Sequence, residues 1–568
     1  WYTYWAATSS NANAEPARYT APVSVTTSAR PMHPSPPRRF NAPLLGALLC
    51  ASASLLVQSA AAQPVPRSVP PRAPAQAPAP FVLAEADIPG LQARIAAGEL
   101  DSVALTEAYL QRIAAIDHSG PQLRSVIALN PQALREAAAR DAERRAGRLR
   151  GPLHGIPVLL KDTINARPLP TTAGSLALQE FRPADAFLVT RLRAAGAVIL
   201  GKTNLSEWAN YRGEASVSGW SARGGQTRNP YRLTHSPCGS SSGSAVAVAA
   251  NLAVVSVGTE TDGSIVCPAA MNGVVGLKPT VGLVSRDGIV PISFSQDSPG
   301  PLARSVSDAA ILLTAMAGRD EADPATATRP GRAVYDYAAR LRPDGLQGAR
   351  IGLLDSPLMA QPGLRALMDD AEARLREAGA TVVHVPALDS GTWQADEEIV
   401  LQYEFKAGLE RYLRRWQAPV RTLPAIIAFN RQHARQELAL FGQELMERAA
   451  RSGTLGDPQY IEARTRARRA AGEQGIDARL KAHQLDALVA PTTGTAWAIS
   501  TEGGDAFPGG SYGAAAVAGY PSLSVPMGHV DGLPAGLLFM GTAWSEPTLI
   551  ELAYAFEQRT MARRPPPL

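Results

Sequence analysis

Two serine-bearing glycine turns and one lysine could together carry out acyl transfer in this chain. The first turn is Cys238-Gly-Ser-Ser-Ser-Gly-Ser244 and the second is Gly258-Thr-Glu-Thr-Asp-Gly-Ser264, which places Ser240 and Ser264 24 residues apart. Lys161 follows an apolar run upstream. A serine hydroxyl attacks a carbonyl carbon well only when a base removes its proton. Here a lysine and a second serine are available in place of the usual histidine, and this pattern indicates hydrolysis of amides.

The chemistry of the three side chains explains why these residue types would occur together. Lysine has a reference pKa of about 10.4, so it must be desolvated to act as a base near neutral pH. Burial of Lys161 at the end of a strand would desolvate it. Ser240 could accept a proton from Ser264 and pass its own to Lys161, because a hydroxyl is both donor and acceptor. The reverse transfer would protonate the leaving nitrogen of an amide.

Short apolar runs alternate with helical patterns around these residues. A strand is predicted over 156–160, ahead of Lys161, and a helix over 244–251 and a strand over 253–257 separate the two serine turns. The other predicted strands are 197–200, 351–354, 381–385, 521–526 and 536–540, and the other predicted helices are 102–116, 187–194, 363–378 and 548–560. This alternation predicts an α/β fold, a single large domain with a mainly mixed or parallel central sheet covered by helices.

The N-terminal part of the chain differs in composition from the rest. Residues 1–31 have no predicted structural role and are interpreted as an upstream extension. Residues 32–62 contain Arg38-Arg39, an apolar stretch and small residues in the order of a signal peptide, so we expect an exported protein, periplasmic or secreted. The apolar stretch is too short to predict a stable membrane anchor. Residues 63–82 are rich in proline and alanine and predict a linker, and residues 83–568 form the predicted catalytic domain.

Composition excludes several classes of function. The chain is 45% hydrophobic and 18% charged, which is typical of a soluble globular protein. Its formal net charge is +5, most of it in the N-terminal 62 residues, so we predict no nucleic-acid partner. No Cys, His or carboxylate cluster has metal-ligand spacing, and we expect no metal or cofactor. Only five of the 55 basic residues are lysines, and only lysine can lose its proton in a protein, which favours Lys161 slightly for proton chemistry.

Two cysteines remain if the predicted signal peptide is removed. Cys238 and Cys267 each lie within three residues of a candidate serine. Export would permit a disulfide, but two cysteines do not define a disulfide framework. We favour a packing role near the site and leave open whether the two are free or paired.

The first turn considered alone has two other interpretations. A Gly/Ser-rich segment is often a flexible loop, although this one leads directly into an Ala/Val-rich stretch rather than into polar sequence. The segment 239–243 also matches Gly-x-Ser-x-Gly, the nucleophile elbow of α/β-hydrolases, with Ser241 as nucleophile. That interpretation requires a downstream acid and histidine, such as Asp486 and His529.

Both turns and the lysine segment together resemble the motifs of the amidase signature family. The likeness covers about residues 83–565, so the predicted catalytic domain is an amidase domain by resemblance. Within the family, the chain is most similar to bacterial secreted amidases of the peptide-amidase type. The segments that carry the likeness are Gly155–Asp162, Cys238–Ser244, Gly258–Ala269, Gly201–Asn204, Gly276–Thr280, Gln296–Pro301 and Gly519–Ser522.

The resemblance implies a role for each candidate residue. Ser264 resembles the nucleophile, Ser240 the bridging serine and Lys161 the base. Ser240 would follow Gly239 through a cis peptide bond. Apart from the resemblance, the hydroxyls of Ser241 and Thr259 could support the relay by hydrogen bonding or could equally serve only to satisfy backbone groups. The family's oxyanion hole corresponds to the backbone N–H groups of Thr261, Asp262, Gly263 and Ser264. Cys238, Ser242 and Asp262 stand where the family often has glycine, which puts only the local loop geometry in doubt.

The resemblance implies an amidohydrolase that cleaves a carboxylic amide C–N bond through an acyl-enzyme on Ser264. Its substrate would be a small-molecule or peptide amide, with a peptide C-terminal amide as the leading candidate. An aryl or aliphatic acylamidase of the same fold is the main alternative. Weaker alternatives are an α/β-hydrolase esterase using Ser241 and an amidotransferase subunit. Residues 390–470 indicate no pocket, so the identity of the substrate stays open.

Overall fold

The computed structural model describes residues 81–328, 331 and 336–568. The predicted upstream extension and signal peptide lie outside these residues, as does the predicted linker up to residue 80. Phe81, which belongs to the predicted linker, packs against Tyr109, with ring centroids 5.7 Å apart.

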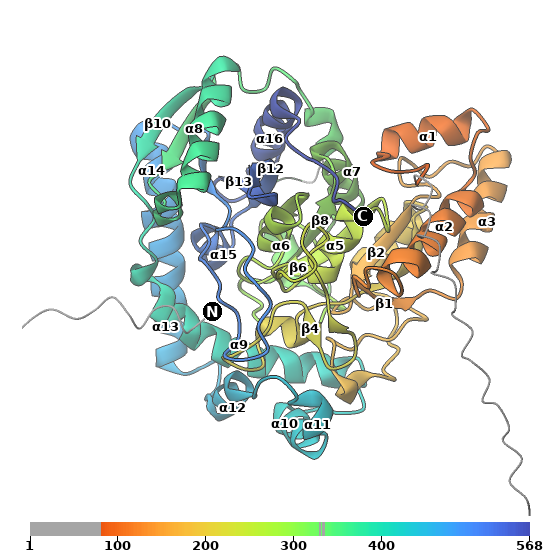
Figure 1. Cartoon of the computed structure of the whole chain (residues 1–568). Helices are drawn as coiled ribbons and strands as arrows, with labels where there is room; N and C mark the ends of the chain where they lie inside the picture. The colour runs from red at the N-terminus through yellow and green to blue at the C-terminus, as the bar shows by residue number, and fades with distance from the viewer. Residues whose placement is uncertain (1–80, 329–330, 332–335) are drawn as a thin grey trace, which may run out of the picture. The chain divides into compact units, whose positions relative to one another are not determined.

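An eleven-stranded mixed sheet forms the centre of the described part of the chain (Figure 1). Neighbours β2/β3, β2/β6, β9/β11 and β9/β10 are parallel, and the other pairs are antiparallel. The predicted α/β domain with a mixed central sheet is therefore confirmed. In spatial order the strands are β1 (Val126–Leu129), β3 (Val198–Thr203), β2 (Pro157–Lys161), β6 (Val255–Glu260), β8 (Ser298–Ala303), β7 (Val275–Lys278), β12 (Ser522–Val530), β13 (Leu533–Met540), β11 (Ala487–Pro491), β9 (Arg350–Leu354) and β10 (Thr381–Val385). A separate two-stranded sheet pairs β4 (Trp220–Ser221) with β5 (Gly225–Gln226).

Helices surround this sheet, and those predicted from apolar periodicity are present. The predicted helix over 102–116 ends at Arg112 and continues as a π-helical segment, Ile113–Asp117. No helix among the described residues has the length and apolar character needed to cross a membrane. The helices are α1 (Ile88–Ala96), α2 (Ser102–Arg112), α3 (Ala133–Arg145), α4 (Phe187–Ala194), α5 (Ser242–Ala249), α6 (Val266–Met271), α7 (Val306–Met316), α8 (Pro362–Glu377), α9 (Gln394–Arg415), α10 (Leu423–Gln432), α11 (Ala434–Glu437), α12 (Glu444–Arg451), α13 (Pro458–Ala471), α14 (Ala478–His483), α15 (Gly513–Ala518) and α16 (Glu546–Thr560).

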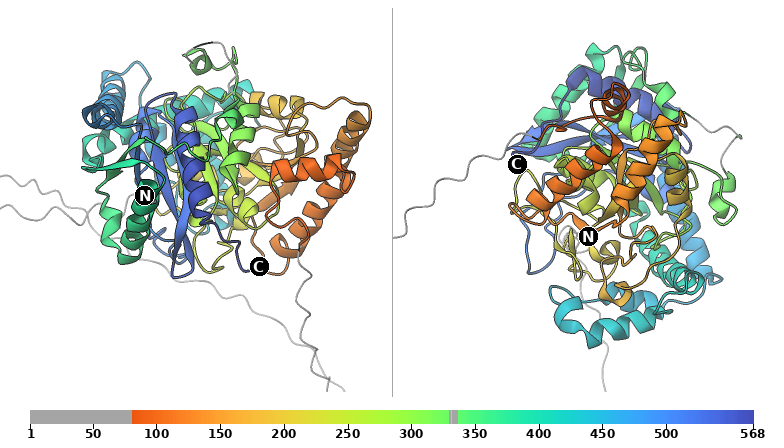
Figure 2. Two further views of the ribbon diagram at one scale, coloured as in Figure 1. Left: turned by 90° about the horizontal axis from the view of Figure 1, so that it is seen from above. Right: turned by 90° about the vertical axis from the view of Figure 1, so that its right-hand side faces the viewer.

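Alternating side chains of the central strands divide between two hydrophobic layers. In β13, Leu537 and Phe539 belong to the layer that contains α7, α8 and α16, and the Phe539 ring lies 6.1 Å from that of Phe556. Leu538 and Met540 belong to the layer formed with α6, α13 and α15. Because successive residues of a strand point to opposite faces, β13 is buried on both sides. Figure 2 shows helices on both sides of the strands.

The ends of two parallel strands bring the candidate residues together. β2 and β6 are adjacent, with Val158 paired to Val255, so their C-terminal ends meet at one edge of the sheet. Lys161 is the last residue of β2, and the turn that carries Ser264 follows β6 directly. The first serine turn leads into α5, whose residues are all buried. Clefts beyond the C-terminal ends of parallel strands are where ligands bind in open α/β sheets.

Residues 390–470, for which no pocket could be predicted, form helices α9 to α12 and most of α13. Helix α9 packs against α12 and α13, and all of these lie in the lower part of Figure 1. Buried Phe405, Leu409 and Leu413 form an apolar stripe on α9 at helical spacing. That spacing was available in the sequence, whereas the position of the helix over the site depends on tertiary packing.

Candidate active site

Lys161 and Ser240 are in direct contact in the interior of the protein. Both side chains are fully buried, and Lys161 Nζ donates to Ser240 Oγ at 2.7 Å. Nζ also donates to the Thr259 carbonyl oxygen at 2.9 Å. The peptide bond between Gly239 and Ser240 is cis, as expected from the resemblance. The predicted base and bridging serine therefore lie within hydrogen-bond distance of each other.

Burial lowers the pKa of Lys161 to about 7. The loss of water around the ammonium group is the main cause, and the nearby carboxylates Asp297 and Glu260 oppose it by favouring the charged form. A large share of the Lys161 side chains is therefore neutral at neutral pH, which a general base requires.

Ser241 joins the two serine turns rather than facing an acid and a histidine. Its backbone N–H donates to the Ser264 carbonyl at 3.1 Å. Its hydroxyl donates to the Thr259 carbonyl at 3.0 Å and accepts from the Thr259 N–H at 3.2 Å. Asp486 instead accepts from the Arg350 backbone N–H, and the His529 ring packs near Tyr231. The contacts of Ser241 fit a supporting role and disfavour the nucleophile-elbow interpretation.

Ser264 lies in a cavity of about 590 Å³. The residue is 6% exposed, whereas Ser240 is fully buried. Thr261 and Asp262 of the same turn also line this cavity, which we call the catalytic cavity. A substrate in it would reach Ser264 without reaching Ser240 or Lys161. This order of access suits Ser264 as the attacking group and the other two as a proton relay.

The turn of Ser264 is shaped by Glu260, a residue that the sequence interpretation did not single out. The buried carboxylate accepts hydrogen bonds from the backbone N–H groups of Ile265 at 2.7 Å and Val266 at 3.0 Å. Burial raises the pKa of Glu260, and the positive charge of Lys278 opposes this rise. Three of the four predicted oxyanion-hole donors, the N–H groups of Thr261, Asp262 and Ser264, belong to residues that line the catalytic cavity.

Glycine is required at two positions of the site. Gly263 has a φ of +81°, and a Cβ there would overlap the ring of Tyr512. A Cβ at Gly239 would overlap the hydroxyl of Ser206. Glycine has no Cβ and populates positive φ freely, so it allows both close approaches.

Asp297 connects the oxyanion turn to the next loop. Its carboxylate accepts from Thr261 Oγ1 at 2.6 Å and from the backbone N–H groups of Ile292 and Ser293 at 2.9 and 3.0 Å. Burial raises the pKa of Asp297 to about 6. Asp297 lies in one of the segments that carry the family resemblance, which was the available sequence signal for it.

Acidic side chains and apolar groups line the catalytic cavity, and none of the described residues that line it is a lysine or arginine. Burial and the neighbouring Glu397 raise the pKa of Asp262 well above its usual value, and burial raises the pKa of Glu397 to about 7. Asp262 Oδ1 is buried without a hydrogen-bond partner, so it is available to a donor on a substrate. The acidic residues are Glu214, Asp262, Glu397, Glu398 and Asp505, and the large apolar ones include Leu358, Trp393, Leu401, Phe507 and Tyr512.

These carboxylates do not form a metal centre. In the part of the chain that the structure describes, no three His, Cys, Asp or Glu side chains gather closely enough to hold a metal ion. Glu214 and Glu398 both pair with Arg448, and Glu397 accepts from Gln296 Nε2 at 2.8 Å. The arrangement offers carboxyl groups that can form hydrogen bonds to a bound molecule, and a cation bound beside Asp262 or Glu397 would favour the charged forms of these two side chains.

A disulfide joins the first serine turn to α6, the helix that follows the second serine turn. Cys238 and Cys267 are bonded, with Cα atoms 6.0 Å apart, across 29 residues of sequence. The favoured packing interpretation of these cysteines is therefore incomplete, because they are covalently paired. Cys238 lies two residues before Ser240 and Cys267 three residues after Ser264. The bond thus closes a loop that contains both serines, α5 and β6.

Replacing both cysteines by alanine is expected to lower the free energy of unfolding by about 3–4 kcal/mol, because the disulfide restricts an unfolded loop of this length. Denaturant unfolding of Cys238→Ala/Cys267→Ala and of the wild type measures this difference. A reductant such as TCEP should move the wild-type midpoint toward that of the variant and leave the variant unchanged. Identical midpoints for the two proteins without reductant would contradict the expectation.

Comparison with known proteins identifies the family. The family model described as Amidase matches residues 104–550. The crystal structure of the native peptide amidase from Stenotrophomonas maltophilia is similar, with a TM-score of 0.84 and 71% identity over 86% of this chain and 99% of that chain. A probable amidase of Arabidopsis thaliana is 42% identical over 86% of this chain and 92% of its own length. A glutamyl-tRNA(Gln) amidotransferase subunit of Acinetobacter baumannii is 36% identical over 80% and 92%. The chain therefore belongs to the amidase family, in agreement with the amidase signature motifs of its sequence.

Proposed function

We propose that this protein hydrolyses peptide C-terminal amides through a Ser264 acyl-enzyme, with Ser240 and Lys161 as the proton relay. Family membership makes the protein a hydrolase of amide C–N bonds. The observation that carries the finer proposal is the 2.7 Å contact between a fully buried Lys161 and Ser240, beside the turn of the accessible Ser264.

In the proposed reaction, Ser264 Oγ attacks the amide carbonyl carbon. Its proton passes to Ser240, which gives its own proton to neutral Lys161. The carbonyl oxygen becomes negatively charged and accepts hydrogen bonds from the backbone N–H groups of the turn 261–264. The relay then returns a proton to the amide nitrogen, the C–N bond breaks, and ammonia leaves. Water, deprotonated by the same relay, hydrolyses the ester on Ser264 and releases the acid.

The catalytic cavity supports a peptide amide as the substrate. Its volume of about 590 Å³ exceeds what a simple aliphatic amide requires, and its apolar side chains can pack against peptide side chains. Asp262 Oδ1 and the Glu397 carboxyl group lie in the cavity and can accept hydrogen bonds from N–H groups, of which a peptide amide has several. The likeness to the Stenotrophomonas maltophilia peptide amidase points the same way.

The negative lining makes a prediction about substrate charge. N-acylated dipeptide amides that differ only in one residue are expected to release ammonia with kcat/KM in the order arginine, leucine, glutamate. The ratio between the arginine and glutamate substrates should be about tenfold or more, equivalent to about 1.4 kcal/mol of differential binding. It should decrease as ionic strength rises, because salt screens charges. Ammonia and amine release are measured separately, so that an acylamidase acting on aryl amides is recognised.

Two variants test whether the cavity causes this order. Glu398→Gln removes a charge inside the cavity and should reduce the ratio. Glu462→Gln removes a charge from the exposed side of α13 and should leave the ratio unchanged.

Release of amine from aryl amides without ammonia release from any peptide amide would favour the acylamidase alternative. A role as amidotransferase subunit, suggested by relatives such as the Acinetobacter baumannii protein, is opposed by the predicted signal peptide.

A further inference from the structure

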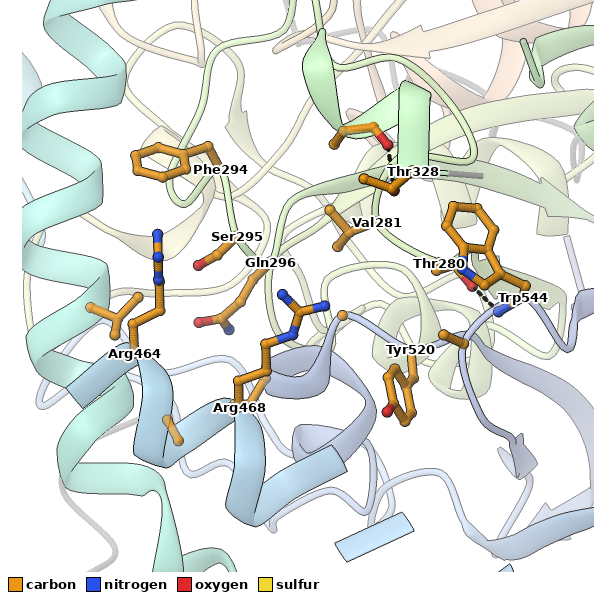
Figure 3. A pocket seen from close by; sticks show the side chains of 16 residues that line it. Thr280, Val281, Phe294, Ser295, Gln296, Thr328, Arg464, Arg468, Tyr520 and Trp544 are labelled. Carbon is orange, nitrogen blue, oxygen red and sulfur yellow. Dashed lines mark hydrogen bonds between the residues drawn. The ribbon is translucent and has the colours of Figure 1, made fainter. Parts of the chain in front are cut away.

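A second cavity, of about 380 Å³, lies next to the catalytic cavity and has no assigned role. Gln296 separates the two cavities. It lines the second one, and its side-chain amide donates to Glu397, which lines the first. Figure 3 shows the second cavity between Arg464 and Arg468 of α13 and the loop that carries Phe294 and Gln296.

The arginines of α13 differ in how their charges are compensated. Arg466 donates two hydrogen bonds to the Asp396 carboxylate, at 2.7 and 2.9 Å. Arg469 Nε lies 3.6 Å from Glu473 Oε2. Arg464 and Arg468 are one helical turn apart and line the cavity. Within the described residues, neither of these two forms an ion pair with a carboxylate; Arg464 donates to the Tyr460 hydroxyl at 3.1 Å.

Among the residues that the structure describes, no carboxylate lines the second cavity. Two acidic side chains beyond its lining, Glu404 and Asp477, accept hydrogen bonds from hydroxyl groups of lining residues. Ser295 donates to Glu404 at 2.9 Å, and Tyr520 donates to Asp477 at 2.6 Å. The positive charge at the cavity is therefore not balanced from within, which is opposite to the catalytic cavity with its five acidic residues.

Apolar and aromatic groups form the rest of the second cavity. Phe294, Tyr520 and Trp544 provide aromatic surface, and Val281 and Val517 provide aliphatic surface. Thr280 accepts a hydrogen bond from the Trp544 backbone N–H at 2.9 Å, and its own hydroxyl proton remains available to a ligand. The cavity thus combines a cationic side with an apolar floor.

We propose that the second cavity binds a small carboxylate with an apolar body. A planar guanidinium binds a carboxylate through paired, charge-assisted hydrogen bonds. Arg464 and Arg468 would hold the carboxylate group, and the aromatic side chains would pack against the apolar body. A site of this size takes a molecule such as an aryl-alkyl acid. The proposal does not depend on the reaction assigned to Ser264.

Titration calorimetry with phenylacetate tests this proposal, with 2-phenylethanol as the uncharged analogue. The wild type should bind phenylacetate at least tenfold more tightly than 2-phenylethanol. Arg464→Gln/Arg468→Gln should weaken phenylacetate binding at least tenfold. Arg466→Gln/Arg469→Gln is the matched control: it removes the same charge from the same helix outside the cavity, and its affinity should stay within about twofold of the wild type.

Hydrolysis of a neutral peptide amide reports whether the variants are folded. Both double variants should keep the wild-type rate, because all four arginines lie outside the catalytic cavity. Equal weakening in the two double variants would show a nonspecific charge effect and overturn the proposal. So would unchanged binding in Arg464→Gln/Arg468→Gln, which would place the acid elsewhere, for example in the catalytic cavity.

Discussion

Replacing Ser264 by alanine is expected to reduce kcat for a peptide amide by on the order of 10⁴-fold or more, because no covalent intermediate can form. The backbone N–H groups of the turn remain in place, so a small residual rate above the uncatalysed reaction should persist. Steady-state ammonia release measures the loss. A fluorophosphonate should label the wild type at Ser264, which peptide mass spectrometry locates, and should not label Ser264→Ala.

Ser241→Ala is the matched control for this experiment. Ser241 lies in the other serine turn and holds Thr259 through both hydrogen bonds of its hydroxyl. Its loss should reduce activity by much less than the loss of Ser264, because it removes contacts between the turns rather than the attacking group. The opposite result, with Ser241→Ala inactive and Ser264→Ala active, would establish the esterase-type nucleophile elbow instead.

The positions of most strands could be predicted because central strands bury both faces. The run 156–160 overlaps β2 (Pro157–Lys161) with a shift of one residue, and all residues of β2 are buried. Residues 381–385 form β10 as predicted, although β10 is an edge strand in which only Val382 and Val385 are buried. Parallel neighbours place strand ends at one edge of a sheet, so the meeting of Lys161 with the serine turns followed from the order of elements once the family motifs were recognised.

The surroundings of these residues could not be predicted in the same way. Gln296 and Glu397 are 101 residues apart and meet only because α9 packs over the loop that follows β7. The partners of Glu260 are backbone N–H groups, which leave no trace in side-chain types. Pairing of Cys238 with Cys267 likewise depends on the distance between the two turns, and sequence spacing does not determine that distance.

Activity is expected to rise with pH through about 7 and then level off, because Lys161 must be neutral to accept a proton. Its pKa is lowered to about 7 by burial, so below this pH the protonated form dominates and kcat/KM should fall about tenfold per pH unit. Lys161→Met should lose about 10²–10⁴-fold in kcat/KM. The pH dependence of kcat/KM for a neutral peptide amide measures the effect in the wild type.

The variant Asp297→Asn shows whether protonation of Lys161 or of Asp297 causes the fall of kcat/KM at low pH, which we call the acid limb. Asp297 has its pKa raised to about 6, and its negative charge raises that of Lys161. If Lys161 causes the acid limb, removing this charge should move the limb to lower pH. If Asp297 itself causes the limb, the limb should disappear in Asp297→Asn, and the base role of Lys161 would be rejected.

The pH dependence of the free energy of unfolding provides an independent test of the burial of Lys161. The pKa of Lys161 is lower in the folded than in the unfolded protein, so between about 7 and its ordinary value of 10.5 the unfolded chain binds more protons. The destabilising effect of the buried lysine is therefore fully present below pH 7 and decreases as pH rises toward 10.5.

Lys161→Met should be more stable than the wild type at pH 6, and this difference should shrink between pH 7 and 10. Denaturant unfolding at a series of pH values measures it, and a constant difference would mean that the lysine is not desolvated. A variant that gains stability while it loses activity would show that Lys161 is kept in the core for its proton chemistry rather than for the fold.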